Sequence, residues 1–111
     1  MIKSHPLTSA TLHILLALAG RDLHGYGIIQ EVARESDGHY RMGPGTLYDN
    51  LKRLMDAGLV VDVPRSASAP DEERRMYSLS VDGRQALAAE VDRMQKVVKE
   101  ARLRLGRPGT A

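Results

Sequence analysis

The chain has 111 residues, enough for one domain with a modest hydrophobic core. Its formal charge of only +2 excludes a uniformly basic protein, although it leaves room for a local cationic surface. The absence of cysteine excludes disulfides, thiolate metal sites and cysteine nucleophiles. Because no signal peptide is visible and no apolar run is long enough to cross a bilayer, we expect a cytoplasmic protein that makes no contact with membranes.

Residues 7–19 predict a first helix that is apolar on nearly every side instead of along one stripe. A small domain covers only part of such a helix. The pattern therefore fits two arrangements equally well, a central core helix or a helix whose remaining apolar surface meets a partner.

Residues 26–35 predict a second helix, which starts after a turn rich in glycine and polar residues. Its inward side chains recur at helical spacing and are Ile28, Ile29 and Val32. The link that follows, residues 36–43, is rich in turn residues and carries Tyr40 and Arg41, which could place hydrogen-bond donors near a phosphate backbone.

Residues 44–57 predict a short helix whose two ends are marked in the sequence. Pro44 suits the first helical position, and Gly58 suits a left-handed residue just past the end. The inward stripe is formed by Leu47, Leu51 and Leu54. The opposite face is polar and carries Gly45, Tyr48, Asp49, Lys52, Arg53 and Asp56. This face is either simply solvated or a surface that recognises an anionic partner.

The order of elements after this helix favours recognition. Residues 59–63 and 76–80 alternate in the manner of strands and should pair as a hairpin around a loop without apolar periodicity. Ser80 is a plausible N-cap for a last helix. A helix followed at once by a two-stranded ribbon is typical of a winged helix-turn-helix, whose second motif helix enters the major groove of DNA. The expected fold class is therefore mainly α with a small β-hairpin, a winged helix-turn-helix plus a C-terminal dimerisation helix.

The last helix carries apolar residues at alternating steps of four and three, namely Leu87, Val91, Met94, Val98, Ala101 and Leu105. This 3.5-residue period favours lengthwise packing against another helix, as in a coiled coil. The alternative is a helix that lies back on its own domain. We expect residues 1–80 to form the winged helix-turn-helix domain, residues 81–105 the dimerisation helix, and residues 106–111 a frayed tail.

Several fragments together resemble the PadR family of transcriptional regulators, in its short form with a single C-terminal helix. They are residues 23–29 (LHGYGII), 43–48 (GPGTLY), 51–54 (LKRL), 57–60 (AGLV), 75–79 (RMYSL) and 83–84 (GR). The resemblance implies a homodimeric winged-helix repressor that binds a pseudo-palindromic operator in double-stranded DNA. It also implies a dimer made by the C-terminal helix together with the first helix, which adds Leu12, Leu15 and Leu16 to the interface.

The candidate DNA-binding residues are Tyr40, Arg41, Thr46, Tyr48, Lys52, Arg53, Arg74 and Arg75. Arg53 suits bidentate contact with guanine, whereas Thr46 lies in a first helical turn that suits a phosphate, with local capping as the alternative. Tyr48 could donate to a phosphate or pack against the wing. The acidic run at residues 71–73 lies near enough to occupy the two wing arginines instead, and Asp49 adds a carboxylate to the exposed helix face.

Two rival functions share this fold. One is a winged helix used for contact with another protein, which would show no salt-sensitive affinity for DNA. The other is a drug-responsive sensor with a small-molecule pocket at the dimer interface, although the chain has no tryptophan or phenylalanine for an aromatic clamp. Four scattered histidines show no metal-ligand spacing, and His24 should have a structural role at a helix start. We expect no metal, no cofactor and no enzymatic activity, because no nucleophile elbow, phosphate loop or paired-carboxylate motif is present.

Overall fold

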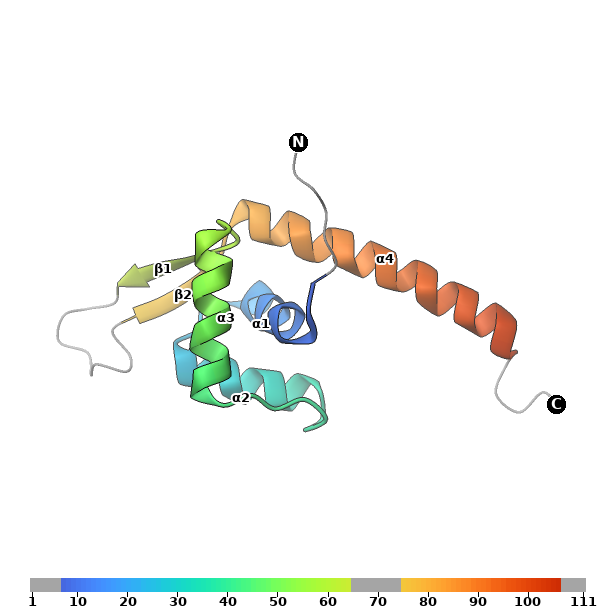
Figure 1. Ribbon diagram of the computed structural model, residues 1–111, viewed down its shortest axis with the longest axis horizontal. Coiled ribbons are helices and arrows are strands. Elements are labelled where there is room, and N and C mark those ends of the chain that lie inside the picture. The colour runs from blue at the N-terminus through green and yellow to red at the C-terminus, as the bar shows by residue number, and fades with distance from the viewer. Residues whose placement is uncertain (1–6, 65–74, 107–111) are drawn as a thin grey trace.

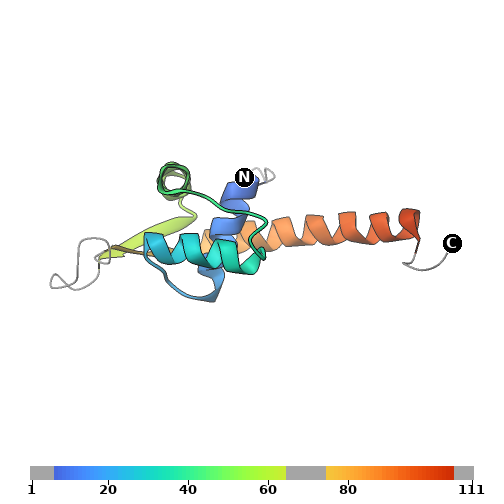
Figure 2. The ribbon, with the colours of Figure 1, turned by 90° about the horizontal axis from the view of Figure 1, so that it is seen from below.

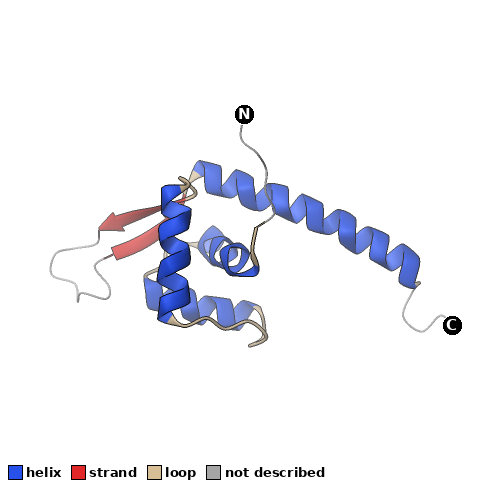
Figure 3. Ribbon diagram, viewed as in Figure 1, coloured by secondary structure: helices blue, strands red, loops and turns tan. Residues whose placement is uncertain are grey.

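The computed structural model describes residues 7–64 and 75–106 (Figure 1). In chain order, the elements are α1 (Ser9–Gly20), α2 (Gly25–Glu35), α3 (Pro44–Asp56), β1 (Val60–Pro64), β2 (Arg75–Leu79) and α4 (Val81–Leu105). The predicted fold, mainly α with a small β-hairpin and a C-terminal helix, is confirmed, because the described residues form four helices and one antiparallel hairpin (Figure 3).

Helix α1 is the central element of the core and contacts α2, α3, α4 and β2. It begins two residues later than predicted because the Thr8 side chain caps it, accepting a hydrogen bond from the Thr11 N–H at 3.2 Å. Ile14, Leu15 and Leu18 are completely or almost completely buried, whereas Leu16 is 42% exposed. The core-helix arrangement is therefore correct for most of α1, and an apolar strip remains uncovered.

The ends of α2 and α3 follow from local chemistry. His24 is the N-cap of α2, and its Nδ1 accepts a hydrogen bond from the Gly27 N–H at 3.0 Å, which confirms its predicted structural role. Pro44 is the first residue of α3, and Gly58 has a φ of +77°, as predicted from the sequence. The predicted inward stripe of α3 is confirmed, because Leu47, Leu51 and Leu54 are buried.

The hairpin pairs β1 with β2 from Val60 opposite Leu79 to Pro64 opposite Arg75. Each strand lies one residue away from its predicted position, shifted forward in β1 and backward in β2. The turn before α2 joins the same small sheet: Leu23 donates to the Tyr77 carbonyl at 3.2 Å and accepts from the Tyr77 N–H at 2.8 Å. This bridge fixes the hairpin to the start of α2.

Helix α4 has two parts with different surroundings. Ser80 caps its start, accepting from the Gly83 N–H at 2.9 Å as predicted, and the first turns pack on the domain through Leu87 and Glu90. The C-terminal part of the helix projects past the other elements, in the direction opposite to the hairpin (Figures 1 and 2). In the described part of the chain, no helix is long and apolar enough to cross a membrane.

Candidate nucleic-acid interface

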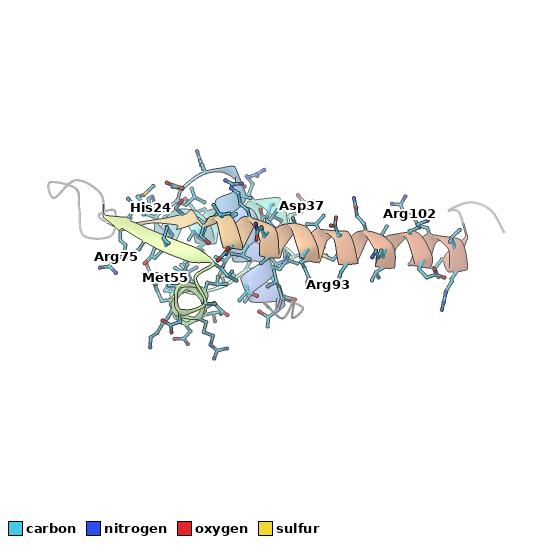
Figure 4. All side chains as sticks on the ribbon, turned by 90° about the horizontal axis from the view of Figure 1, so that it is seen from above. His24, Asp37, Met55, Arg75, Arg93 and Arg102 are labelled. Atoms are coloured by element: carbon cyan, nitrogen blue, oxygen red, sulfur yellow. The ribbon has the colours of Figure 1, made fainter. Side chains whose placement is uncertain are left out.

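The outer face of α3 carries two exposed cations. Because the leucine stripe of α3 is turned inward, Lys52 and Arg53 are exposed on the opposite side, and neither forms an ion pair within residues 7–64 and 75–106. Figure 2 shows α3 end-on, displaced to one side of α2, the hairpin and α4, and Figure 4 shows its side chains projecting away from the fold. Asp49 and Asp56 are also exposed, so the two cations are balanced by two carboxylates.

Tyr48 lies on α3 with its ring against the start of α2. A Cβ atom built on Gly25 would lie 2.2 Å from the Tyr48 hydroxyl oxygen, so a side chain at position 25 would force this ring to move. The ring is still half exposed. Burial raises the pKa of the neighbouring Tyr77 phenol above its ordinary value of 10.0, and the nearby Tyr48 adds to this effect. Sequence reasoning proposed the wing or a phosphate as the partner of Tyr48 and missed its contact with α2.

The N-terminal end of α3 is open. Gly43 is its N-cap and provides no side-chain hydrogen bond, and the Thr46 side chain is exposed in the first turn. The local contact at Thr46 is made by its carbonyl, which accepts from Asn50 Nδ2 at 2.7 Å. Backbone N–H groups at a helix N-terminus and an exposed hydroxyl are the kinds of donor that bind phosphates in proteins.

The hairpin contributes a paired cation. Arg75 Nη1 lies 2.9 Å from Asp62 Oδ2, and Figure 4 places Arg75 on the same side of the hairpin as α3. Sequence reasoning offered residues 71–73 as competitors for the wing arginines and missed Asp62. Arg74 and residues 71–73 lie outside the described residues.

In the link before α3, Tyr40 and Arg41 have different surroundings. The Tyr40 ring stacks on His13 of α1 with ring centres 4.6 Å apart, and its N–H donates to Ser36 Oγ at 3.0 Å. Arg41 is exposed. The Tyr40 ring is therefore occupied in holding the link on α1, whereas the Arg41 guanidinium is accessible to a partner.

A histidine and a carboxylate lie behind the same link. His13 Nδ1 is 3.6 Å from Glu35 Oε1. Burial raises the pKa of the Glu35 carboxyl above 4.5, while His13 acts in the opposite direction. Residues 7–64 and 75–106 contain no group of three or more His, Cys, Asp or Glu side chains that could hold a metal ion.

A second surface feature is an apolar groove of about 690 Å³ between α1 and α4. Its walls include Leu12 and Leu16 of α1 and Leu87, Val91, Met94 and Val98 of α4. Of the residues assigned to a dimer interface, these six line the groove, while Ala101 and Leu105 lie further along α4. Leu15 has no exposed surface and belongs to the core of its own chain, so its side chain is not available to a partner.

Comparison with known proteins gives a consistent picture. Residues 14–89 match the sequence profile described as "Transcriptional regulator PadR-like family". The chain is 36% identical over 89 residues to the transcriptional regulator Rv3488 of Mycobacterium tuberculosis, a match that covers 80% of this chain and 78% of that protein.

Solved structures share the fold. A PadR family transcription regulator from Clostridium difficile aligns with a TM-score of 0.76 at 23% identity, over 89% of this chain and all of that one. PadR of Bacillus subtilis, solved in complex with operator DNA, aligns with a TM-score of 0.67 at 25% identity, over 76% of this chain and 47% of that one.

Proposed function

The chain belongs to the PadR-like family of transcriptional regulators, whose members are not enzymes, and from this premise we propose that it binds double-stranded DNA. The observation that carries the proposal is the outer face of α3, where Lys52 and Arg53 are exposed and free of ion pairs within the described ranges. Arg75 lies on the same side of the molecule. The operator complex of the Bacillus subtilis relative supports this assignment.

The proposed contacts follow from the geometry of duplex DNA. The major groove admits one α-helix, and we propose that α3, which lies to one side of α2, the hairpin and α4, enters it (Figure 2). Arg53 then reaches base edges, Lys52 reaches a base or a phosphate, and Thr46 and Arg41 contact the backbone at the N-terminal end of α3. The Tyr48 side chain lies between α3 and the start of α2, and its hydroxyl donates a hydrogen bond to a phosphate of the DNA backbone there.

We further propose that a second copy of the chain covers the groove between α1 and α4. The exposed apolar residues Leu16, Val91, Met94 and Val98 line it, and Val98 is 48% exposed although it lies in a 3.5-residue apolar repeat. A repeat of this kind supports packing along another helix. The proposed interface comprises Leu12, Leu16, Leu87, Val91, Met94, Val98, Ala101 and Leu105, without Leu15.

A two-fold dimer presents two α3 helices, which meet two half-sites about one helical turn, roughly 34–36 Å, apart. The proposed target is therefore a pseudo-palindromic operator, and occupation of such a site near a promoter represses transcription. In this proposal the winged-helix domain, residues 1–80, binds DNA. The projecting helix, residues 81–105, makes the dimer.

The test is selection of bound fragments from genomic DNA by the purified full chain, followed by footprinting of the enriched fragments. The expected result is a protected inverted repeat whose half-sites are separated by about one turn of the duplex. If no fragment were enriched over bulk DNA at low salt, the DNA-binding function would be wrong. The alternative, a winged helix that contacts another protein, would then be favoured.

A further inference from the structure

The cations on the proposed DNA-facing side differ in one respect. Arg41, Lys52 and Arg53 form no ion pair among residues 7–64 and 75–106, whereas Arg75 is paired with Asp62. We propose that Asp62 is a specificity-determining residue, which restricts Arg75 to one orientation and thereby suppresses binding to DNA other than the operator. This inference rests on the DNA-binding function proposed above.

The hairpin register creates the pair. Asp62 lies opposite Tyr77, and Arg75 is two residues before Tyr77 on the same strand, so the two charged residues are diagonal neighbours on one face of the ribbon. Nearer the domain, the residues on this face of the ribbon are Tyr77 and Leu79, and both are buried. The pair therefore lies where the buried face ends, on the side of the hairpin that α3 occupies.

The pair leaves Arg75 able to bind a phosphate. A guanidinium has five N–H donors, and the contact with Asp62 is made through Nη1 at 2.9 Å. The Arg75 side chain is 64% exposed, so its other donors remain accessible. Asp62 thus fixes the direction in which these donors point and places a negative charge beside any phosphate that they approach.

These two effects act differently on operator and non-operator DNA. Non-specific binding is supplied almost entirely by phosphate contacts in many registers, so a restricted Arg75 beside a carboxylate makes it weaker. On the operator, base contacts by α3 fix the register, and an Arg75 already held in one orientation loses less conformational freedom on binding. The carboxylate therefore lowers affinity for non-operator DNA more than affinity for the operator.

The experiment compares Asp62→Asn with the full-length parent on two duplexes of equal length, the selected operator and an unrelated sequence. The control is Glu100→Gln, which removes a carboxylate paired with Arg104, also at 2.9 Å, near the free end of α4. For Asp62→Asn we expect the unrelated duplex to bind several-fold more tightly, with a salt slope steeper by up to about 0.9. Operator affinity should stay near that of the parent.

Two results would overturn the inference. One is an Asp62→Asn protein that matches Glu100→Gln on the unrelated duplex. The other is a loss of operator affinity as large as that caused by Arg75→Ala, which would make Asp62 a support for Arg75 on all DNA. A parent protein that bound neither duplex would instead overturn the DNA-binding function itself.

A double variant tests whether Asp62 acts through Arg75. When Asp62→Asn is introduced into an Arg75→Ala background, the gain on the unrelated duplex should disappear. A gain that persisted undiminished would show that Asp62 acts only as a general negative charge, and the assignment to the Arg75 pair would be wrong.

Discussion

Gly83 and Gly25 allow neighbouring elements of this fold to approach closely. A Cβ atom on Gly83 would lie 2.1 Å from the Leu59 carbonyl oxygen, so glycine lets the start of α4 lie directly on the backbone that follows α3. At Gly25 the obstacle would be the Tyr48 hydroxyl, the end of a side chain. Backbone yields less easily than a side chain, so the two positions differ in how much substitution they tolerate.

Substitution of Gly83 by alanine should therefore destabilise the fold by about 1–3 kcal/mol, the range for overpacking a filled core. Its matched control is Gly45→Ala in α3, where an added Cβ has no atom within 4 Å, and which should leave the free energy of unfolding unchanged or raise it. Urea unfolding followed by circular dichroism measures the two values. Equal stabilities for the two variants would show that the contact with Leu59 relaxes freely.

Glu90 contributes a pH-dependent part of the stability. Hydrogen bonding from Arg93 lowers the pKa of the Glu90 carboxyl below 4.5, and the Leu7 N–H donates to the same carboxylate at 3.4 Å. The folded state thus binds this proton less tightly than the unfolded chain. The stabilisation is present above about pH 4.5 and is lost as the pH falls through the lower folded pKa.

We therefore expect Glu90→Gln to lower the Tm at pH 7 and to have a much smaller effect at pH 3. Thermal unfolding of both proteins at the two pH values gives the comparison, with Glu100→Gln, an exposed carboxylate in the same helix, as the control that changes Tm little. A Tm difference that was the same at pH 3 and pH 7 would argue for a packing role of Glu90 instead.

At the scale of elements, sequence reasoning succeeded where the cause is local. Pro44, Ser80 and the His24 turn determine helix starts through their own backbone or side-chain chemistry, and the structure has each in its expected role. The sequence did not predict pairings between residues that are far apart in the chain. The bridge from Leu23 to Tyr77 joins residues far apart in the chain, and no local pattern specifies such a pairing.

Helix α4 shows the same limit. Its heptad pattern runs without interruption from Leu87 to Leu105, yet Leu87 lies in the core of its own domain while Val91, Met94, Val98 and Leu105 are exposed. Periodicity identifies the apolar face of a helix, but it does not show whether the same domain or a partner chain covers each part of that face. The alternative in which the helix lies back on its own domain therefore holds for the start of α4, and packing against a partner helix stays a prediction for the rest.

The proposed dimer makes a specific prediction for this helix. Val98→Asp places a carboxylate in an apolar helix seam and should convert the dimer to a monomer, because a buried unpaired charge costs several kcal/mol. Val81→Asp is the matched control: Val81 is 73% exposed at the start of α4, where an acidic residue is favourable, so the dimer should persist. Sedimentation at micromolar concentration distinguishes the two states. A Val98→Asp protein that remained a tight dimer would exclude the groove as the interface.

At the scale of the whole molecule, the hairpin and the free end of α4 lie at opposite ends of the fold, with α3 on one side between them (Figures 1 and 2). The structure thus separates the surface proposed for DNA from the surface proposed for the partner copy. We therefore expect a substitution at one surface to leave the local structure of the other unchanged.

The proposed contact between α3 and DNA is tested by binding of the selected operator across a salt series. We expect Arg53→Ala to weaken binding by about 1–3 kcal/mol if Arg53 contacts a base, or to reduce the salt slope by about 0.9 if it contacts a phosphate. Arg104→Ala, which removes an arginine from the far end of α4, should bind like the parent. An Arg53→Ala protein with the affinity and salt slope of the parent would show that this face of α3 does not contact DNA.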